Sequence, residues 1–291
     1  MESISKDQYK NMSVAYLQLV FVSFFWALST ILIKLFITSI PTFHLLMGQS
    51  LSALIFLVTI KPKKILLIKK EDIKIGGYAG LFIFGTYFFN FYGLKFTTAS
   101  KAGFLVSLSV LIIPIFKAFI KKEKPTKWTI ITILISLVGL KLISGINGTD
   151  FNIGDLIILG TAFSYTFYVL VLDKYLKDKD YIVLSMLQLI FMFILSFIFA
   201  TIYEGINITY LKLGIIPIII TGILGIGMAM FFQMRAQRVA SPESVGLILL
   251  CEPIFTLIMA FFILKEAIFL KGILGSGLIL IALVLAVVKR I

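Results

Sequence analysis

Long apolar stretches alternate with short polar segments along the whole chain. Each stretch holds about 20 residues, the length that an α-helix needs to cross the hydrocarbon core of a bilayer. Apolar and polar residues do not alternate with a period of two inside them, which favours helices over a membrane barrel. The first run is longer than a signal-peptide core and is expected to be a retained span. Ten spans are predicted, at residues 14–37, 43–60, 76–94, 102–120, 128–145, 154–175, 182–203, 213–234, 244–264 and 270–288.

The same pattern occurs twice along the chain. Residues 119–123 (FIKKE) reappear at 262–266 (FILKE), an offset of 143. Further pairs occur at offsets of 143 or 139, namely Asn90 with Gln233, Trp26 with Tyr165, Lys34 with Asp173, and Gln49 with Gln188. Duplication inside a hydrophobic chain is typical of transporters built from two structural repeats. We therefore expect two five-helix repeats, residues 1–147 and 148–291, joined by the loop at 147–152.

The positions of the basic residues orient these spans. With the N-terminus in the cytoplasm, 19 of the 27 lysines and arginines lie in cytoplasmic segments, five on the opposite side and three within spans. This positive-inside bias predicts that both termini are cytoplasmic. Because each repeat has an odd number of spans, the second repeat must enter the membrane in the opposite orientation. An inverted repeat of this kind supports alternating access around a site near the bilayer midplane.

Composition excludes several other classes of protein. Hydrophobic residues make up 60% of the chain and charged residues 14%, and the mean hydropathy is +1.07, which a soluble domain does not reach. The net charge of +13 does not indicate nucleic-acid binding, because the lysines are spread over short loops. A single histidine and a single cysteine argue against a histidine-based metal site and an internal disulfide. His44, beside Pro41, is expected to be a solvated turn residue.

Glu252 is the sharpest candidate for a functional residue. A carboxylate within an apolar span is costly, and by default it marks a substrate path, a proton relay or a counter-ion. The alternative is that Glu252 and Pro253 only shape the entry of a helix, with the carboxylate solvated at the interface. We predict that Glu252 binds substrate and is the candidate for proton coupling.

Aromatic and amide side chains inside the spans complete the candidate site. The aromatic candidates are Trp26, Tyr165 and Tyr168, and the amide candidates are Gln49, Asn90, Gln188 and Gln233. Aromatic rings can stack on an organic solute or surround a cation, but they also simply pack between helices. Amides can bind a zwitterion without fixing the sign of its charge, but they also hold helices together at about 0.6 kcal/mol each. Lys34 and Asp173, near the ends of their spans, are expected to be interfacial anchors.

Several motifs resemble those of the EamA family within the drug/metabolite transporter superfamily. They are residues 97–104 (TTASKAGF), Pro114 and 122–125 (KEKP) in the first half, and 240–244 (ASPES), Glu252-Pro253 and 264–266 (LKE) in the second. The resemblance covers nearly the whole chain and implies ten helices in two inverted bundles. It implies a central cavity lined chiefly by the third, fourth, eighth and ninth helices, with contributions from the first, second, sixth and seventh. That adds Ser107 to the candidates, whereas Gln49 stands where the family often has an arginine.

The expected function is secondary active transport of a small organic metabolite in the cytoplasmic membrane of a bacterium. Export of amino acids is common in the family, and the amides fit a zwitterionic or neutral solute. One alternative is an importer of an organic cation such as choline, with Glu252 as counter-ion and Trp26 and Tyr165 in an aromatic cage. More remote alternatives are an intramembrane enzyme and a channel. The expected partners are the solute, the bilayer and protons, with no cofactor, metal or catalytic residue, in a monomer or homodimer.

Overall fold

The computed structural model describes residues 6–122, 124–144, 152–267 and 269–289, and helices dominate all four ranges. The first half contains α1 (Lys6–Phe36), α2 (Thr42–Ile60), the 3₁₀ helix η1 (Pro62–Leu67), α3 (Lys70–Gly93), α4 (Ala99–Ser107), α5 (Ser109–Lys121) and α6 (Lys127–Ser144). The second contains α7 (Ile153–Tyr175), η2 (Leu176–Asp178), α8 (Tyr181–Phe199), η3 (Ala200–Glu204), α9 (Ile208–Leu213), α10 (Ile215–Ile220), η4 (Thr221–Met228), α11 (Ala229–Gln237), α12 (Pro242–Ile248), α13 (Cys251–Met259), η5 (Ala260–Leu264) and α14 (Leu270–Lys289). The expected joint at 147–151 lies outside the described residues.

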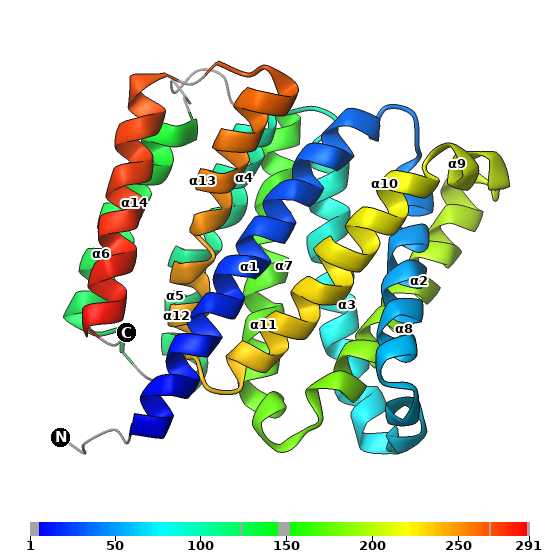
Figure 1. Cartoon of the computed structure of the whole chain (residues 1–291), viewed down its shortest axis with the longest axis horizontal. Coiled ribbons are helices and arrows are strands. Elements are labelled where there is room, and N and C mark those ends of the chain that lie inside the picture. Colours follow the sequence, from blue (N-terminus) through cyan, green and yellow to red (C-terminus); the bar gives the residue numbers. More distant parts are fainter. Residues whose placement is uncertain (1–5, 123, 145–151, 268, 290–291) are drawn as a thin grey trace.

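Every run predicted from the hydrophobic pattern is mainly helical in the part of it that the structure describes, which confirms the all-α prediction. Eight stretches of the described residues are long and apolar enough to cross a membrane. They are Asn11–Phe36, Thr42–Ile60, Lys101–Ile120, Ile153–Asp178, Tyr181–Glu204, Ile215–Gln237, Pro242–Leu264 and Leu270–Lys289. The remaining two predicted runs form α3 and α6, which run alongside these stretches in the bundle (Figure 1).

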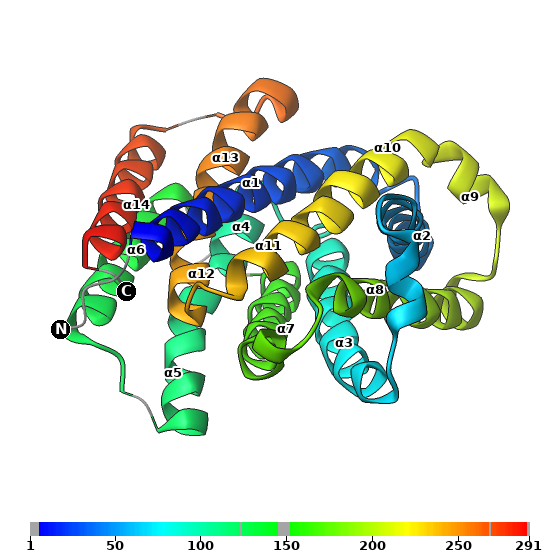
Figure 2. The ribbon, with the colours of Figure 1, turned by 60° about the horizontal axis from the view of Figure 1, so that its bottom comes forward.

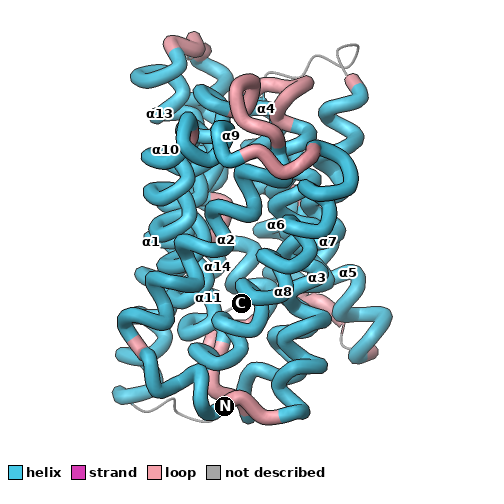
Figure 3. The backbone as a smooth tube through the Cα atoms, turned by 90° about the vertical axis from the view of Figure 1, so that its right-hand side faces the viewer, coloured by secondary structure: helices cyan, strands magenta, loops and turns pink. Residues whose placement is uncertain are grey.

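The helices run roughly between the two ends of one bundle. Figure 1 shows α6 and α14 at one edge, α2 and α8 towards the other, and α1 and α11 crossing the front. Figure 2 shows the same layers after rotation, and Figure 3 shows that most loops gather at the two ends. The described chain begins in α1 and finishes in α14 at the same end of the bundle (Figure 1). This requires an even number of crossings.

Two of the predicted runs are not continuous helices. The run at 102–120 is interrupted at Leu108, between α4 and α5, and the run at 244–264 is interrupted at Leu249 and Leu250, between α12 and α13. Pro253 has no N–H to donate to the carbonyl of Leu249, and the N–H of Glu252 donates to that carbonyl instead (2.9 Å). At the repeat offset of 143, Leu108 corresponds to Cys251, so the two interruptions lie within two residues of equivalent positions. The two interrupted helices pack together, α4 on α13 and α5 on α12.

The duplicated motif encodes one backbone conformation in both copies. Lys122 follows α5 with φ 57°, and Lys265 follows η5 with φ 60°; among the described residues no other non-glycine has a positive φ. A left-handed residue of this kind ends a helix by turning the chain back on itself. The N–H of Glu266 accordingly donates to the carbonyl of Ala260 (3.1 Å). The repeat visible as FIKKE and FILKE is therefore a repeated helix stop.

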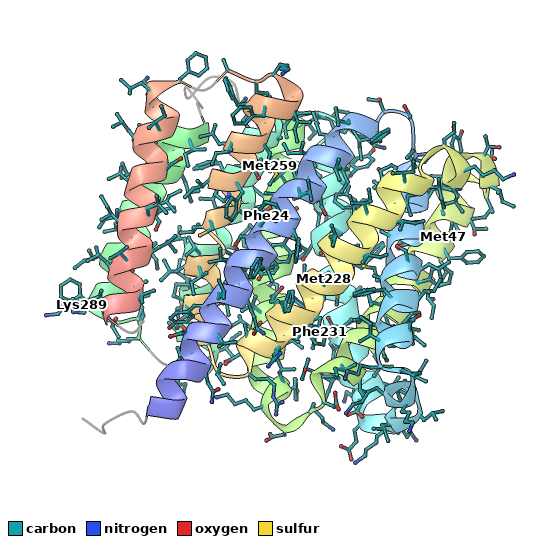
Figure 4. The ribbon with its side chains drawn as sticks, viewed as in Figure 1. Phe24, Met47, Met228, Phe231, Met259 and Lys289 are labelled. Atoms are coloured by element: carbon teal, nitrogen blue, oxygen red, sulfur yellow. The ribbon has the colours of Figure 1, made fainter. Side chains whose placement is uncertain are left out.

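The outer surface of the bundle is apolar. Leu17 and Leu134 are each 57% exposed and Phe119 is 80% exposed, and many similar side chains surround the bundle (Figure 4). Such a belt would be unstable in water and is normal against lipid tails. Hydroxyl groups inside the helices bond to their own backbone, as when Ser50 donates to the carbonyl of Leu46 (2.7 Å). The chain is a multi-pass membrane protein.

His44 is not the solvated turn residue that its neighbourhood in the sequence predicts. Its side chain is fully buried, its Nδ1 lies 2.8 Å from a carboxylate oxygen of Glu204, and its Nε2 accepts from the N–H of Asn207 (3.2 Å). The same carboxylate accepts from the backbone N–H groups of Phe43 and His44, so it caps α2. The prediction was wrong because the partner, Glu204, lies 160 residues away in the second half of the chain.

Candidate substrate cavity

A polar cavity lies inside the bundle, where the two interrupted helices meet α1, α3 and α7. The free space in it is about 50 Å³, enough for a few water molecules. It is lined by Trp26, Ser29 and Thr30 of α1, Thr86, Tyr87, Asn90 and Phe91 of α3, Val106, Ser107 and Ser109 at the first interruption, Thr161 and Tyr165 of α7, and Leu249, Leu250 and Glu252 at the second. Five of the residues predicted for the site therefore lie together: Trp26, Asn90, Ser107, Tyr165 and Glu252.

The interruption between α12 and α13 places Glu252 in the cavity wall. The side chain is 8% exposed, so it is not the solvated interfacial residue of the alternative interpretation. Its carboxyl group has no hydrogen-bond or ion-pair partner among the side chains that the structure describes. A buried carboxyl group without a protein partner is costly unless a proton, water or a solute compensates it. The wall thus presents a group that can bind a proton or a positively charged part of a solute.

Aromatic residues form the wall that faces the interruptions. The rings of Trp26 and Tyr165 meet edge to face with centroids 5.5 Å apart. The indole N–H of Trp26 donates to the hydroxyl of Tyr87 (3.0 Å), which in turn donates to the carbonyl of Gly225 (2.9 Å). Trp26 and Tyr165 are equivalent in the sequence repeat, so their contact lies where the two halves meet.

Tyr165 also connects the cavity to a polar seam between α11 and helices α7 and α8. Gln233 donates to the hydroxyl of Tyr165 (2.8 Å), and Gln237, one turn further, donates to the carbonyl of Val169 (2.8 Å). Tyr168 stands beside Tyr165, with ring centroids 6.0 Å apart, and is buried. Gln233 and Tyr168 therefore contact Tyr165 and do not themselves line the cavity.

Two of the predicted amides lie away from the cavity. Gln49 donates to the hydroxyl of Thr221 (2.5 Å), which joins α2 to η4. Gln188 donates to the sulfur of Met234 (3.5 Å), which joins α8 to α11. Both side chains are fully buried between helices. Their surroundings fit the role of interhelical contacts that was weighed against substrate binding.

The sequence reasoning missed several polar residues of the wall. Thr86, Tyr87, Asn90 and Phe91 lie on one face of α3, at the spacing expected for neighbours on a helix. Only Asn90 was predicted, because only Asn90 has an amide partner in the other repeat. Reading the helical spacing outward from Asn90 would have found Thr86 and Tyr87. The Oδ1 of Asn90 and the hydroxyl of Thr161 are buried without a hydrogen-bond partner, so both can bind a solute or water.

Contacts at the centre repeat in the same way as the sequence. A Cβ added to Gly103 would lie 3.7 Å from Pro253, and one added to Gly246 would lie 3.5 Å from the Cα of Val110. Gly103 and Gly246 are equivalent at the offset of 143, and so are Val110 and Pro253. The two interrupted helices thus cross each other by the same close glycine contact used twice. Within the part of the chain that the structure describes, no group of three histidine, cysteine or acidic side chains could hold a metal ion.

This fold and cavity define a helical membrane protein with a small polar cavity at its centre, and comparison with known proteins identifies the family. The EamA-like transporter family matches residues 13–145 and again residues 152–288, so the chain belongs to that family and carries two EamA repeats. It is a transporter and not an enzyme, and the enzyme alternative is thereby set aside.

One relative agrees with this assignment, and one solved structure shares the fold. An uncharacterized transporter of Archaeoglobus fulgidus is 29% identical over 221 residues, which are 75% of this chain and 70% of the relative. A solved crystal structure superposes with a TM-score of 0.75 at 18% identity, and the match covers 95% of this chain and 97% of the other. At that identity the likeness shows the fold alone.

Proposed function

We propose that the chain is a secondary active exporter of small organic metabolites, with amino acids as its main substrates, in a bacterial cytoplasmic membrane. It works by alternating access around the cavity that contains Glu252. The proposal includes α3 and α6 as spans, which gives ten spans, both termini in the cytoplasm, and two inverted halves at residues 1–147 and 148–291. The glycine crossings at Gly103 and Gly246 support the repeat, and the shared end of α1 and α14 supports the even number of spans.

The observation that carries the proposal is the buried carboxyl group of Glu252 in a wall of hydroxyl, amide and aromatic groups. A carboxylate complements the ammonium group of an amino acid. The unpartnered Oδ1 of Asn90 and the hydroxyl of Thr161 are further polar groups for the rest of the solute. Glu252 is also the proposed site of proton coupling, because solute and proton would compete for the same carboxyl group.

The size of the cavity supports a conformational cycle. A free space of about 50 Å³ is below the roughly 300–1,000 Å³ of ordinary ligand pockets, so a metabolite can enter only if helices move apart. The seam at Gln233 and Gln237 is the element that we expect to open. The Oε1 atoms of both amides are buried without hydrogen-bond partners, and water entering the seam would satisfy them.

One observation favours a second candidate, an importer of an organic cation such as choline. Among the described residues that line the cavity there is a carboxylate but no lysine or arginine, so nothing with a full positive charge is there to bind a substrate carboxylate. Trp26, Tyr87 and Tyr165 supply rings that attract a cation. The two candidates differ in whether the solute must carry a carboxylate.

Proteoliposome transport with a metabolite panel, with and without a pH gradient, tests the proposal. We expect amino acids to be transported, and we expect Glu252→Gln to abolish the effect of the pH gradient. Because the variant loses a charge-assisted contact, it should bind an ammonium-bearing solute about tenfold more weakly, or worse. Asp178→Asn, which changes an exposed acid outside the cavity, is the matched control.

The outcomes separate the candidates. Transport of choline but not of amino acids would replace the first candidate with the second. If Glu252→Gln left transport and its pH dependence unchanged, the central role of Glu252 would be lost.

A further inference from the structure

A basic hollow lies at the end of the bundle where α2 ends, α8 begins and α11 ends. Its volume is about 680 Å³, and it is surrounded by four basic side chains: Lys61, Lys177, Arg235 and Arg238.

The wall of the hollow is completed by Tyr181 and Phe231, which are aromatic and half-buried. Figure 4 shows Phe231 on the front of α11, near the lower end of the bundle.

The four cations of this hollow have no acidic partner among the described residues, unlike their neighbours at the same end. Lys64 pairs with Asp180, and Lys179 pairs with Glu71 (2.9 Å) and Asp72 (3.0 Å). The hydrogen bonds that Lys179 donates to Glu71 and Asp72 raise its pKa, as expected for a cation held by carboxylates. Positive charge is thus neutralised on one side of this end and left unpaired in the hollow.

Apolar side chains place the hollow at the level of the bilayer surface. Val239, in its wall, is 48% exposed, and Ile60, next to Lys61, is 50% exposed. In η1, which follows Lys61, Leu66 is 83% exposed and Leu67 is 55% exposed. Exposed leucines beside lysines are typical of a segment that lies in the membrane interface. The hollow therefore joins unpaired cations to a surface that acyl chains can cover.

We propose that this hollow binds the headgroup of an anionic phospholipid of the cytoplasmic leaflet. The phosphate lies among Arg235, Arg238, Lys61 and Lys177, and an acyl chain runs over Phe231 and Val239. Arginine and lysine pockets between helices at the cytoplasmic side suit such headgroups. The site uses the proposed orientation of the chain but is independent of the transported solute.

Lipid retention by the purified full-length protein tests the site. The protein is exchanged into detergent with phosphatidylglycerol or phosphatidylcholine, and bound lipid is measured by native mass spectrometry. We expect preferential retention of phosphatidylglycerol. Each removed charge should lower the affinity for phosphatidylglycerol about fivefold. Two double variants, Arg235→Gln/Arg238→Gln and Lys61→Gln/Lys177→Gln, should therefore each lower it about 25-fold.

The matched control is Lys124→Gln/Lys127→Gln, which removes two exposed cytoplasmic lysines outside the hollow. It should retain phosphatidylglycerol like the unaltered protein. Equal loss in the control and the hollow variants would overturn the proposal, because the effect would then be general surface charge. Soluble glycerol phosphate should not displace the lipid at equal concentration, and displacement would show a site for a free phosphate compound instead.

Discussion

Glu204 shows how one residue of the second half holds an element of the first. Its carboxylate caps the first turn of α2 and bonds the buried ring of His44. Because Nε2 of His44 accepts from Asn207, the proton of a neutral ring is assigned to Nδ1, which donates to Glu204. Each hydrogen bond of this cluster therefore has one assigned donor and one assigned acceptor.

Replacing Glu204 by alanine should destabilise the protein by about 2 kcal/mol or more. The loss of a helix cap costs about 1 kcal/mol, and a buried donor left without its acceptor costs about 1–3 kcal/mol. Thermal unfolding in detergent measures the change, with Asp178→Ala, an exposed acid, as the control. A melting temperature for Glu204→Ala equal to that of the control would contradict the role of the cluster.

At the scale of elements, glycines let the π-helical segment η4 approach its neighbours. A Cβ on Gly225 would overlap the side chain of Ser29 in α1, and a Cβ on Gly222 would overlap that of Ser52 in α2. By contrast, a Cβ on Gly277 of α14 would meet nothing within 4 Å. Close helix approach through small residues is a main source of stability inside membranes.

Gly225→Ala should therefore lower the melting temperature, whereas Gly277→Ala should leave it unchanged or raise it slightly. The alanine at 277 adds helix propensity in open space, and the alanine at 225 forces α1 and η4 apart. Thermal unfolding of the two variants side by side is the measurement. Equal melting temperatures would show that the packing at η4 adapts without cost.

The interrupted helices mark the limit of what the hydrophobic pattern could predict. The pattern placed the runs at 102–120 and 244–264 correctly, because lipid requires apolar side chains along both. It gave no sign of the interruptions at Leu108 and Leu249, since those leucines are as apolar as their neighbours. The prolines were the available signal, but a proline inside a membrane helix can also be tolerated without a break.

At the scale of the whole molecule, most candidate site residues were predicted by comparing polar and aromatic positions between the two repeats. Trp26, Asn90, Ser107, Tyr165 and Glu252 line the cavity. Gln49 and Gln188 lie between helices, because a buried amide has the same sequence signature whether it faces a solute or another helix. Distinguishing these cases requires knowledge of which helix faces meet.

The proposed topology can be tested by labelling single cysteines in a Cys251→Ser background. Lys212→Cys, in α9, should react with a membrane-impermeant thiol reagent applied to intact cells, because the segment before α10 is expected outside. Lys63→Cys, in η1, should react only after the membrane is made permeable. Labelling of both positions from the same side would contradict the inverted arrangement.

The seam below Tyr165 has a consequence for the rates of the transport cycle. At the repeat offset of 143, Gln233 and Gln237 correspond to Asn90 and Leu94. The seam on one side of the cavity thus buries two amides with unpartnered oxygens, and the corresponding positions at the end of α3 hold one amide, Asn90, and the fully buried Leu94 that follows the helix. Wetting an amide is easier than wetting a leucine. We therefore expect the two directions of opening to have unequal barriers, so that an empty carrier dwells longer in one orientation than in the other although its halves share one fold.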